Sequence, residues 1–268
     1  MRGRDLILKT GGARLSLTAQ VQALFAAGRV GGMWDMGDTS TLFQDAAGAT
    51  PVTAVTQPIG RVNDKSGNGN HATQPAAGSR PLYQVVSSYG CAQFDATDDA
   101  LLFPAITFGG AFNTFVAGKV TGGTQGVHLW RTADVNGTWA KYKSGDATTP
   151  TGTGSGSPTY AVNGTALSPS QQGQLYTQIN GVDSVVESIG VVLTAETALQ
   201  LSGFVGSLFT GNAHRVLMIS GTLTAAEKLL CRRWAAEGNG APALPANTIY
   251  DTSASAITDS SGSIIETT

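Results

Sequence analysis

The sequence predicts an all-β fold, a sandwich of two antiparallel sheets, with a short N-terminal helix and one closing helix near the C-terminus. Many short runs rich in Val, Phe, Tyr and Thr alternate with turn-forming residues, a pattern typical of β-sandwiches and jelly rolls. Only two segments show the spacing of an amphipathic helix. No repeat of the kind found in solenoids or propellers is visible. A chain of 268 residues is long enough to bury one sizeable core.

The first predicted helix lies near the N-terminus. Its apolar residues follow one another at helical spacing and are Leu17, Val21, Leu24 and Phe25. Ser16 before them is a suitable N-cap, and Gly28 after them is a suitable stop. We therefore treat residues 1–32 as an N-terminal arm with one helix, which packs either on its own domain or on a neighbouring subunit.

Residues 33–240 are predicted to form the sandwich. Turn-forming residues are dense up to residue 81, most of all at 63–71, because Asn, Asp and Gly tolerate the backbone of tight turns. Predicted strands cover residues 91–94, 101–103, 112–120, 127–130, 175–179, 204–209 and 214–219. Asn180-Gly181 lies between two β-rich runs and is the strongest hairpin signal in the chain. Residues 144–158 are predicted to form a long loop.

The second predicted helix closes the domain. Thr224 and Glu227 have the spacing of a capping box, in which each side chain caps a backbone N–H of the other residue. Leu229, Leu230, Arg233 and Trp234 follow at helical spacing. Gly238 then ends the helix. Residues 241–268, rich in Ser and Thr, are predicted to be a C-terminal tail or an arm that becomes ordered on assembly.

Charge and composition narrow the range of functions. Charged residues make up 13% of the chain, the net charge is −2, and no basic run is present. Nucleic-acid binding needs concentrated Lys and Arg, and membrane insertion needs a long apolar stretch that this sequence lacks. We therefore expect neither nucleic-acid binding nor membrane insertion, and we expect the protein to be made in the cytoplasm. A surface poor in charge also favours packing against other subunits, although a genome biased toward Ala, Gly and Thr would produce the same composition.

Several phrases resemble one superfamily. In chain order they are Asp64-Lys-Ser-Gly-Asn-Gly-Asn-His71, Phe94-Asp-Ala-Thr-Asp-Asp99, Tyr176–Gly181, Phe204–Phe209 and Leu223–Glu227. Each resembles a phrase of laminin-G-like and concanavalin A-like domains, and the order is the same. The resemblance implies a concanavalin A-like jelly roll over residues 34–238. One departure is Ala96, where the family usually has Gly, and because Ala resists positive φ the geometry of this turn stays open.

A second resemblance suggests where the protein works. Residues 32–60 are similar to a segment of tailed-phage and prophage structural proteins that precedes the same Asp-Lys-Ser-Gly-Asn-Gly-Asn-His phrase. This implies a virion protein, associated with the tail or the capsid surface, that contacts a host-surface glycan or stabilises the particle. The implied partners are other virion proteins and further copies of this chain. Fold alone does not fix function.

The sequence does not predict catalysis. Glycoside hydrolysis needs two carboxylates at a defined separation, yet no Glu lies two or three residues from another acid. His71, His128 and His214 are expected to be structural, because no nucleophile elbow accompanies them. Cys91 and Cys231 lack metal spacing and are expected to be buried free thiols. We expect a protein that is not an enzyme.

Calcium is the one cofactor that the sequence suggests. Asp95, Asp98 and Asp99 belong to one turn, and carboxylates are the hard oxygen ligands that calcium prefers. Asp64 or Asn70 from the earlier loop are further candidate ligands. The resemblance points the same way, since laminin-G-like relatives often bind calcium on such rims. The alternative, and the commoner outcome, is that these side chains only form hydrogen bonds within their own turns.

The candidate glycan contacts are Trp130, Asn136, Trp139 and Tyr142. A sugar site pairs an exposed aromatic ring with fixed polar groups, and these residues lie in or beside a loop-rich region. The alternative for each aromatic residue is a place in the core. A free carbohydrate-binding module is therefore a second hypothesis for the chain. A glycanase is the third, and it would need two acids within about 9.5 Å in the folded protein.

Overall fold

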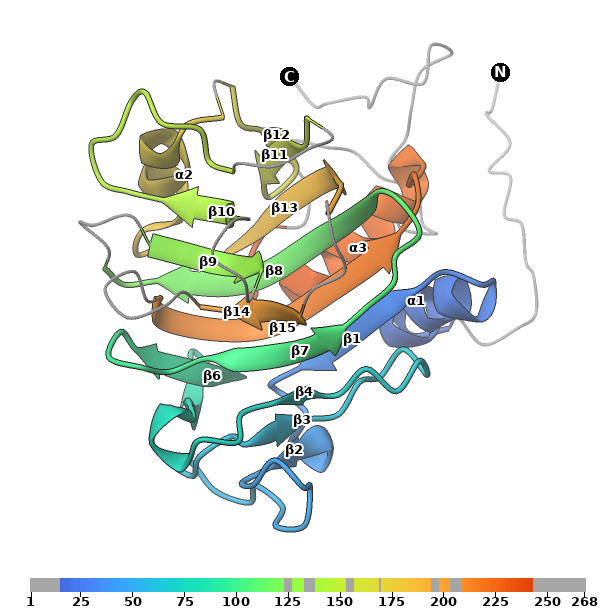
Figure 1. Ribbon diagram of the computed structural model, residues 1–268, viewed down its shortest axis with the longest axis vertical. Coiled ribbons are helices and arrows are strands. Elements are labelled where there is room, and N and C mark those ends of the chain that lie inside the picture. The colour runs from blue at the N-terminus through green and yellow to red at the C-terminus, as the bar shows by residue number, and fades with distance from the viewer. Residues whose placement is uncertain are drawn as a thin grey trace, which may run out of the picture.

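The computed structural model describes residues 15–122, 127–132, 138–152, 157–168, 170–193, 198–202 and 209–242. Within these ranges the chain is mostly β, with two antiparallel sheets and three α-helices (Figure 1). The all-β prediction, with one helix near each end, is confirmed. The facing sides of the two sheets share one core cluster, an arrangement consistent with a β-sandwich. No helix in the described part of the chain is both long and apolar enough to span a membrane.

The first sheet, here called sheet A, has the strand order β12-β11-β13-β8-β15-β6-β5, and β1 pairs with β15. Its strands are β1 (Gly31–Asp35), β5 (Leu82–Val86), β6 (Tyr89–Asp95), β8 (Phe112–Val120), β11 (Thr159–Val162), β12 (Thr165–Ala166), β13 (Ser184–Val191) and β15 (Thr210–Ser220). Strand β15 pairs with β8 along one edge. Along its other edge it pairs first with β6 and then with β1. It is therefore an inner strand that links β8 to both β6 and β1.

The second sheet, sheet B, has the order β10-β9-β14-β7-β4-β3-β2. Its strands are β2 (Leu42–Phe43), β3 (Arg61–Val62), β4 (Ala72–Thr73), β7 (Leu101–Ala105), β9 (Val127–Thr132), β10 (Thr138–Tyr142) and β14 (Ala198–Leu201). Two short 3-10 helices, η1 (Thr39–Thr41) and η2 (Ala77–Ser79), lie in the connections. The predicted strands at 91–94, 101–103, 112–120, 127–130 and 214–219 are confirmed.

Both predicted helices form, with the predicted caps. Helix α1 (Leu17–Ala26) begins after Ser16, whose side chain accepts a hydrogen bond from the Ala19 N–H. Helix α3 (Ala225–Glu237) begins with the complete capping box of Thr224 and Glu227. Gly28 follows α1 with a φ of +96°, a conformation that suits glycine at the end of a helix.

The prediction of a strand at 175–179 is wrong, because this segment lies in helix α2 (Gln172–Ile179). The buried residues of the helix are Gln172, Leu175 and Ile179, spaced by three and four residues. A helix places all three on one face, whereas a strand would place Gln172 on the face opposite Leu175 and Ile179. Asn180 and Gly181 still make a tight turn, with Gly181 at a φ of +74°. The turn joins helix α2 to β13. The prediction of a tight turn is therefore confirmed, and the prediction of a hairpin is wrong. Of the predicted strand at 204–209, only Phe209 lies within the described residues.

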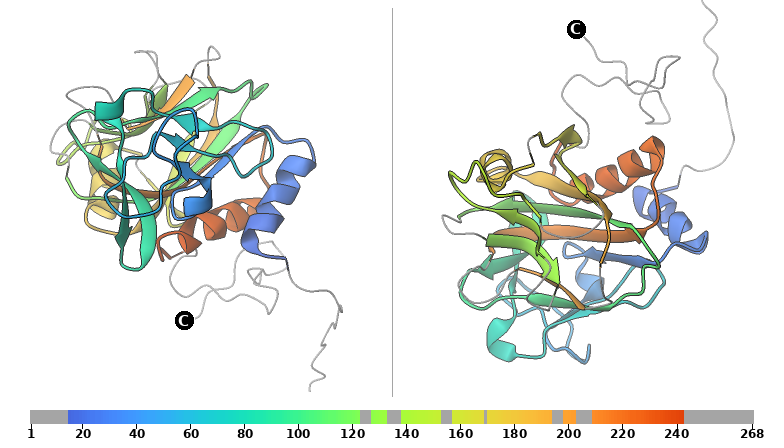
Figure 2. Two further views of the ribbon diagram at one scale, coloured as in Figure 1. Left: turned by 90° about the horizontal axis from the view of Figure 1, so that it is seen from below. Right: turned by 45° about the horizontal axis from the view of Figure 1, so that its top comes forward.

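Where the helices cover it, sheet A is buried on both faces. In β15, Val216 and Met218 belong to the core between the sheets, whereas Leu217 and Ile219 belong to a second core beneath the helices. This explains the unbroken apolar run at this point of the sequence. Helices α1 and α3 lie together over the outer face of sheet A (Figure 2).

Helix α1 packs on its own domain. Val21 and Phe25 are buried in the second core. The Trp234 indole N–H of α3 donates to the Thr18 hydroxyl at 3.2 Å, and the Gln22 side chain donates to the Lys65 carbonyl at 2.7 Å. The described part of the predicted N-terminal arm is therefore part of the folded body. Residues 1–14 and 243–268 lie outside the described residues, so an attachment role for them stays a prediction.

The Asp64–His71 phrase anchors β1. One Asp64 carboxylate oxygen accepts from the Met33 N–H at 2.9 Å, and the Asn70 amide donates to the Gly31 carbonyl at 2.7 Å. His71 Nδ1 accepts from the Asp64 N–H at 3.1 Å. The phrase that carried the family resemblance thus has a structural role in this chain.

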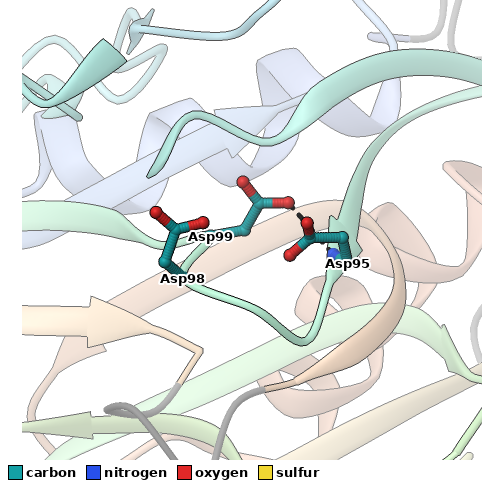
Figure 3. Close-up of side chains that lie close together, drawn as sticks. All are labelled: Asp95, Asp98 and Asp99. Atoms are coloured by element: carbon teal, nitrogen blue, oxygen red, sulfur yellow. Dashed lines mark hydrogen bonds between the residues drawn. The ribbon is translucent and has the colours of Figure 1, made fainter. Parts of the chain in front are cut away.

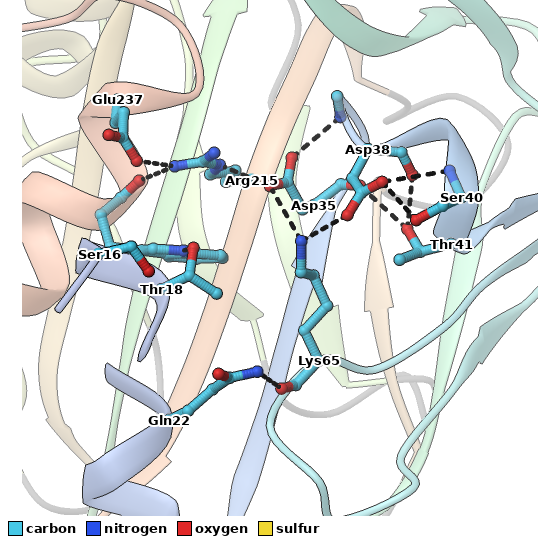
Figure 4. A network of polar contacts seen from close by, with 12 residues as sticks. Ser16, Thr18, Gln22, Asp35, Asp38, Ser40, Thr41, Lys65, Arg215 and Glu237 are labelled. Atoms are coloured by element: carbon cyan, nitrogen blue, oxygen red, sulfur yellow. Dashed lines mark hydrogen bonds and ion pairs between the residues drawn. The ribbon is translucent and has the colours of Figure 1, made fainter. Parts of the chain in front are cut away.

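A network of charged side chains joins β1, β15 and α3 (Figure 4). The Arg215 guanidinium contacts the Asp35 carboxylate at 3.0 Å and the Glu237 carboxylate at 3.1 Å. It also lies 5.0 Å from the Trp234 ring centroid, within the range of a cation–π contact. The Lys65 ammonium contacts Asp38 at 2.6 Å on the other side of Asp35. The network fixes the end of β1 and the turn that follows it.

Candidate functional site

The loop between β6 and β7 brings the three predicted aspartates together. Asp95 is the last residue of β6, and Asp98 and Asp99 shortly precede β7. Ligand oxygens of all three carboxylates lie within 4.8 Å of one another, in a single turn (Figure 3). The sequence prediction that these residues form one acidic cluster agrees with this geometry.

Hydrogen bonds within the loop set its shape. The Asp95 carboxylate accepts from the Thr97 N–H at 2.7 Å, and the Asp99 carboxylate accepts from the Asp95 N–H at 3.0 Å. The Ser79 hydroxyl of η2 donates to Asp98 at 3.0 Å. Ala96 has a φ of +64°, so the turn keeps the left-handed geometry that the family's usual glycine would allow. The turn-stabilising role weighed for these residues is therefore real, and it leaves part of each carboxylate for another partner.

The carboxylates of the loop repel one another. Asp99 is buried, and this burial, helped by the charges of Asp95 and Asp98, raises its pKa to about 6. The hydrogen bond from the Asp95 N–H opposes the rise. Within the part of the chain that the structure describes, no Lys or Arg makes an ion pair with these three residues. A cation placed here would relieve the repulsion.

The acidic loop forms one wall of a pocket of about 460 Å³. The floor is the outer face of sheet A where β6 and β15 lie side by side, and η2 and the start of β5 form the opposite wall. Polar side chains of the lining include Asp95, Asp99, Gln93, Thr210 and Asn212. Asn212 is 6% exposed, and its Oδ1 has no hydrogen-bond partner. Asp95 and Asp99 line the pocket, and with Asp98 beside them they offer the hard oxygen ligands that a divalent cation such as calcium prefers.

Asp64 and Asn70, which the sequence suggested as further calcium ligands, already form hydrogen bonds with other groups. Asp64 accepts hydrogen bonds from the N–H groups of Met33, Ser66 and Asn70. The Asn70 amide is bound to the Gly31 carbonyl. Neither residue belongs to the acidic cluster.

The predicted glycan contacts do not form one described site. Trp130 and Trp139 are opposite one another in the pairing of β9 and β10, but their side chains lie outside the described part of the structure, as does Asn136. Tyr142 is fully buried, which raises the pKa of its hydroxyl, and its ring stacks near Tyr176 at 6.2 Å between centroids. Tyr142 is therefore a core residue, and the prediction that it contacts a glycan is wrong.

The cysteines and one histidine have the structural roles expected. Cys91 and Cys231 are free and buried, and burial raises the pKa of the Cys91 thiol to about 12, so it is not an activated nucleophile. His214 Nδ1 lies 3.0 Å from the Gly90 carbonyl oxygen, and burial lowers the pKa of the imidazole. None of these residues lines the pocket.

Sequence reasoning missed the pocket floor. Gln93 and Asp95 alternate along β6, and Thr210 and Asn212 alternate along β15. Two short polar alternations inside otherwise apolar strands were the available signal. The pairing of β6 with β15, which brings them together, joins segments more than a hundred residues apart and leaves no local trace.

Comparison of the chain with protein-family models, with curated proteins and with solved structures found no match. The laminin-G-like and phage resemblances of the sequence therefore stay predictions.

Proposed function

We propose that the chain is a non-catalytic, lectin-like structural protein of a tailed-phage particle, with a concanavalin A-like jelly roll. Its acidic pocket would be a cation-dependent binding site that contacts a host-surface glycan or stabilises the particle. The observation that carries the binding role is the cluster of Asp95, Asp98 and Asp99, of which Asp95 and Asp99 line a pocket of about 460 Å³. The setting in a virion is supported by the resemblance of residues 32–60 and by a surface poor in charge.

Asp95, Asp98 and Asp99 would hold the cation. Calcium bound there would neutralise the carboxylates and offer a coordination position to a ligand oxygen. The Asp95 N–H orients the Asp99 carboxylate, and the Ser79 hydroxyl orients that of Asp98, so the loop is partly ordered in advance. Such ordering lowers the entropic cost of binding.

A glycanase is the less favoured alternative. Paired catalytic carboxylates lie about 5–9.5 Å apart, so that the sugar or a water fits between them. Ligand oxygens of the acidic loop lie within 4.8 Å of one another, which suits a shared cation better than an intervening anomeric carbon. If the protein releases reducing sugar from a glycan that it binds, the non-catalytic proposal fails.

Thermal denaturation of the full chain in calcium or in a chelator tests the cation site. Binding to the folded state alone adds about 2.7 kcal/mol at a hundredfold excess over Kd, so we expect the melting temperature to rise by several degrees. Asp95→Asn with Asp98→Asn should abolish the rise. Asp146→Asn is the matched control, because Asp146 also caps its own turn but lies outside the pocket. A rise that survives in the double variant would place the calcium elsewhere.

The virion setting is tested by locating the chain. Antibody labelling of purified particles in the electron microscope should mark the tail or the capsid surface. A chain that is found only free, and that binds glycans as a monomer, would support the carbohydrate-binding module instead.

A further inference from the structure

The pocket on the outer face of sheet A is accessible to a side chain of another molecule. Leu82 of the edge strand β5 is 37% exposed, and Gln93 and Asp95 of β6, which also line the pocket, are exposed. A volume of about 460 Å³ falls within the range of roughly 300–1,000 Å³ typical of small-ligand sites. The pocket therefore offers both the room and the accessible groups that an inserted side chain needs.

The lining of the pocket combines apolar and acidic groups. Pro58 and Leu82 are apolar, whereas Asp95 and Asp99 belong to the acidic loop. A lysine or arginine side chain has the matching character, because its apolar stem packs on an apolar surface while its charged head forms charge-assisted hydrogen bonds with carboxylates. The chemistry of the lining therefore suits a basic side chain that enters the pocket from solvent.

The acidic loop has no cationic partner within the described body. None of the described basic side chains forms an ion pair with its three carboxylates. Arg80 does line the pocket, but its guanidinium donates to the backbone carbonyls of Gln74 and Pro75. A basic side chain from outside the described body would neutralise charge that nothing within it neutralises.

The sequence contains one segment of matching charge, residues 1–14, here called the basic segment. It carries four basic residues and one acid, although the net charge of the chain is −2. The basic residues are Arg2, Arg4, Lys9 and Arg14. Residues 243–268, in contrast, carry three acids and no Lys or Arg, so the carboxylates of the acidic loop repel them. Because complementary charge selects partners and suppresses wrong ones, it favours the basic segment as the occupant of the pocket.

The basic segment joins the body at the end opposite the pocket. It precedes α1, and α1 leads into β1, where Gly31 pairs with Ile219 near the end of β15. Thr210, at the start of β15, lines the pocket, and a strand of this length spans about 30 Å. Figure 1 shows α1 and the connection between β6 and β7 on opposite sides of the molecule. This arrangement favours a head-to-tail contact between copies, and fourteen extended residues reach up to about 50 Å.

We propose that the pocket binds the basic segment of a second copy of this chain, with an arginine or lysine head on the acidic loop and its stem on Leu82. Repetition of the contact gives head-to-tail chains or a closed ring. Calcium and the basic segment compete for the same carboxylates, so calcium releases the contact. This competition rests on the proposed cation site, whereas the contact itself rests only on the pocket and on the charges.

Sedimentation velocity of the full chain in a chelator tests the contact. The segment variant is Arg2→Gln with Arg4→Gln and Lys9→Gln, and the pocket variant is Asp95→Asn with Asp98→Asn. We expect the unaltered chain to form oligomers, and each variant alone to lose about tenfold or more in the affinity of self-association. Added salt should weaken the oligomers of the unaltered chain, because salt screens exposed charges. An unchanged melting temperature in the chelator shows that each variant is folded.

Mixing the two variants separates a contact between copies from one within a single chain. The segment variant keeps an intact pocket, and the pocket variant keeps an intact basic segment. The mixture should therefore form dimers with one copy of each variant and nothing larger. The matched control for the segment variant makes the same change of charge outside the pocket lining, and it should associate as the unaltered chain does. Its substitutions are Lys141→Gln, Lys143→Gln and Lys228→Gln.

The outcomes separate this contact from the proposed cation site. An unaltered chain that stays monomeric in the chelator, or oligomers that persist in both variants, overturns the contact. Variants that lose self-association but do not combine on mixing overturn the contact between copies. Calcium that raises the melting temperature of the unaltered chain and leaves its oligomers intact overturns the shared site, while the cation site stands. Oligomers that behave as expected in the chelator, without any calcium-induced rise in melting temperature, support the contact and overturn the cation site.

Discussion

At the scale of single residues, the acidic loop contains a strained position. Ala96 has a φ of +64°, a region that costs a side chain with a Cβ about 1–2 kcal/mol. The Ala96 side chain is exposed, so its substitution changes no packing. Asp95 and Asp98 flank this strained backbone, and the strain is therefore tied to the geometry that gathers the carboxylates.

Ala96→Gly should raise the free energy of unfolding by roughly 0.5–1 kcal/mol, because relief of strain outweighs the extra freedom that Gly has in the unfolded chain. Urea denaturation measures the change. Ala54→Gly is the control, since Ala54 is also exposed but does not have a positive φ, and this variant should be less stable than the unaltered chain. A destabilised Ala96→Gly variant would contradict the turn geometry.

The environment of His71 predicts how the free energy of unfolding depends on pH. Its Nδ1 accepts from the Asp64 N–H, so the folded protein holds the neutral imidazole, and burial together with the Arg61 charge lowers its pKa. A lowered pKa means that the stabilisation is present above the unfolded value of about 6.5 and is lost as the pH falls below it. We expect the contribution of His71 to the unfolding free energy to decrease between pH 7 and pH 5. Asp99 contributes in the opposite direction, because its pKa is raised to about 6 in the folded protein.

In His71→Asn the unfolding free energy should fall less between pH 7 and pH 5 than in the unaltered chain, because the Asn oxygen can accept the same N–H without titrating. Denaturation at both pH values measures the slope. Some slope should remain, since burial also lowers the pKa of His214. An unchanged slope would show that His71 does not contribute.

Individual residues also show how far the sequence could be interpreted. The aspartate cluster was predictable because three acids within five positions of one turn must lie close together. The burial of Tyr142 was not predictable, because the local sequence at the end of a strand does not show which face of the sheet a residue lies on. Asn212 has the same limitation, because its lack of a partner depends on strands that are distant in sequence.

At the scale of elements, helix α1 decides where the folded body begins. The sequence left open whether this helix packs on its own domain or on a neighbouring subunit. The burial of the α1 residues Val21 and Phe25 shows that it packs on its own domain, so removal of the helix should destabilise the sandwich. The amphipathic pattern and the flanking residues predicted the helix and its caps. Its packing partner α3 could not be predicted, because it lies some two hundred residues further along the chain.

Phe25→Ala should lower the free energy of unfolding by about 3–5 kcal/mol, since it removes a buried aromatic side chain. Leu15→Ala is the control, because Leu15 is 60% exposed and its loss should change stability by less than about 0.5 kcal/mol. Guanidinium denaturation of both variants measures the difference. If Phe25→Ala costs no more than the control, α1 is not docked, and the interpretation of residues 15–32 as a free arm returns.

At the scale of the whole molecule, the all-β class and the two terminal helices followed from period-2 runs and from capping residues. The assignment of strands to sheets did not, because pairings such as β1 with β15 join segments about 180 residues apart. The mistaken strand at 175–179 has the same cause. Its Asn-Gly turn was local and correct, while the preceding segment forms a helix that buries Gln172, Leu175 and Ile179 on one face.

Deletion of residues 243–268 should leave the melting temperature unchanged. The described body closes at Ala241, which is buried and whose N–H donates to the Asn239 side chain. If the tail is an assembly arm, the shortened chain should lose self-association in sedimentation velocity and should not enter particles. A marked fall in melting temperature would show that the tail belongs to the folded body.

The pairing of β1 with β15 has a mechanical consequence. Gly31 begins β1 and lies opposite Ile219 near the end of β15, so the chain enters and leaves this antiparallel pair at the same end. A pull between the two ends of the chain would first load the contact of α1 with α3. It would then unzip β1 from β15 one hydrogen bond at a time, while the rest of the sandwich carried little force. A particle that holds the protein by both ends would therefore load the pairing of β1 with β15, and attachment by one end would leave this pairing unloaded.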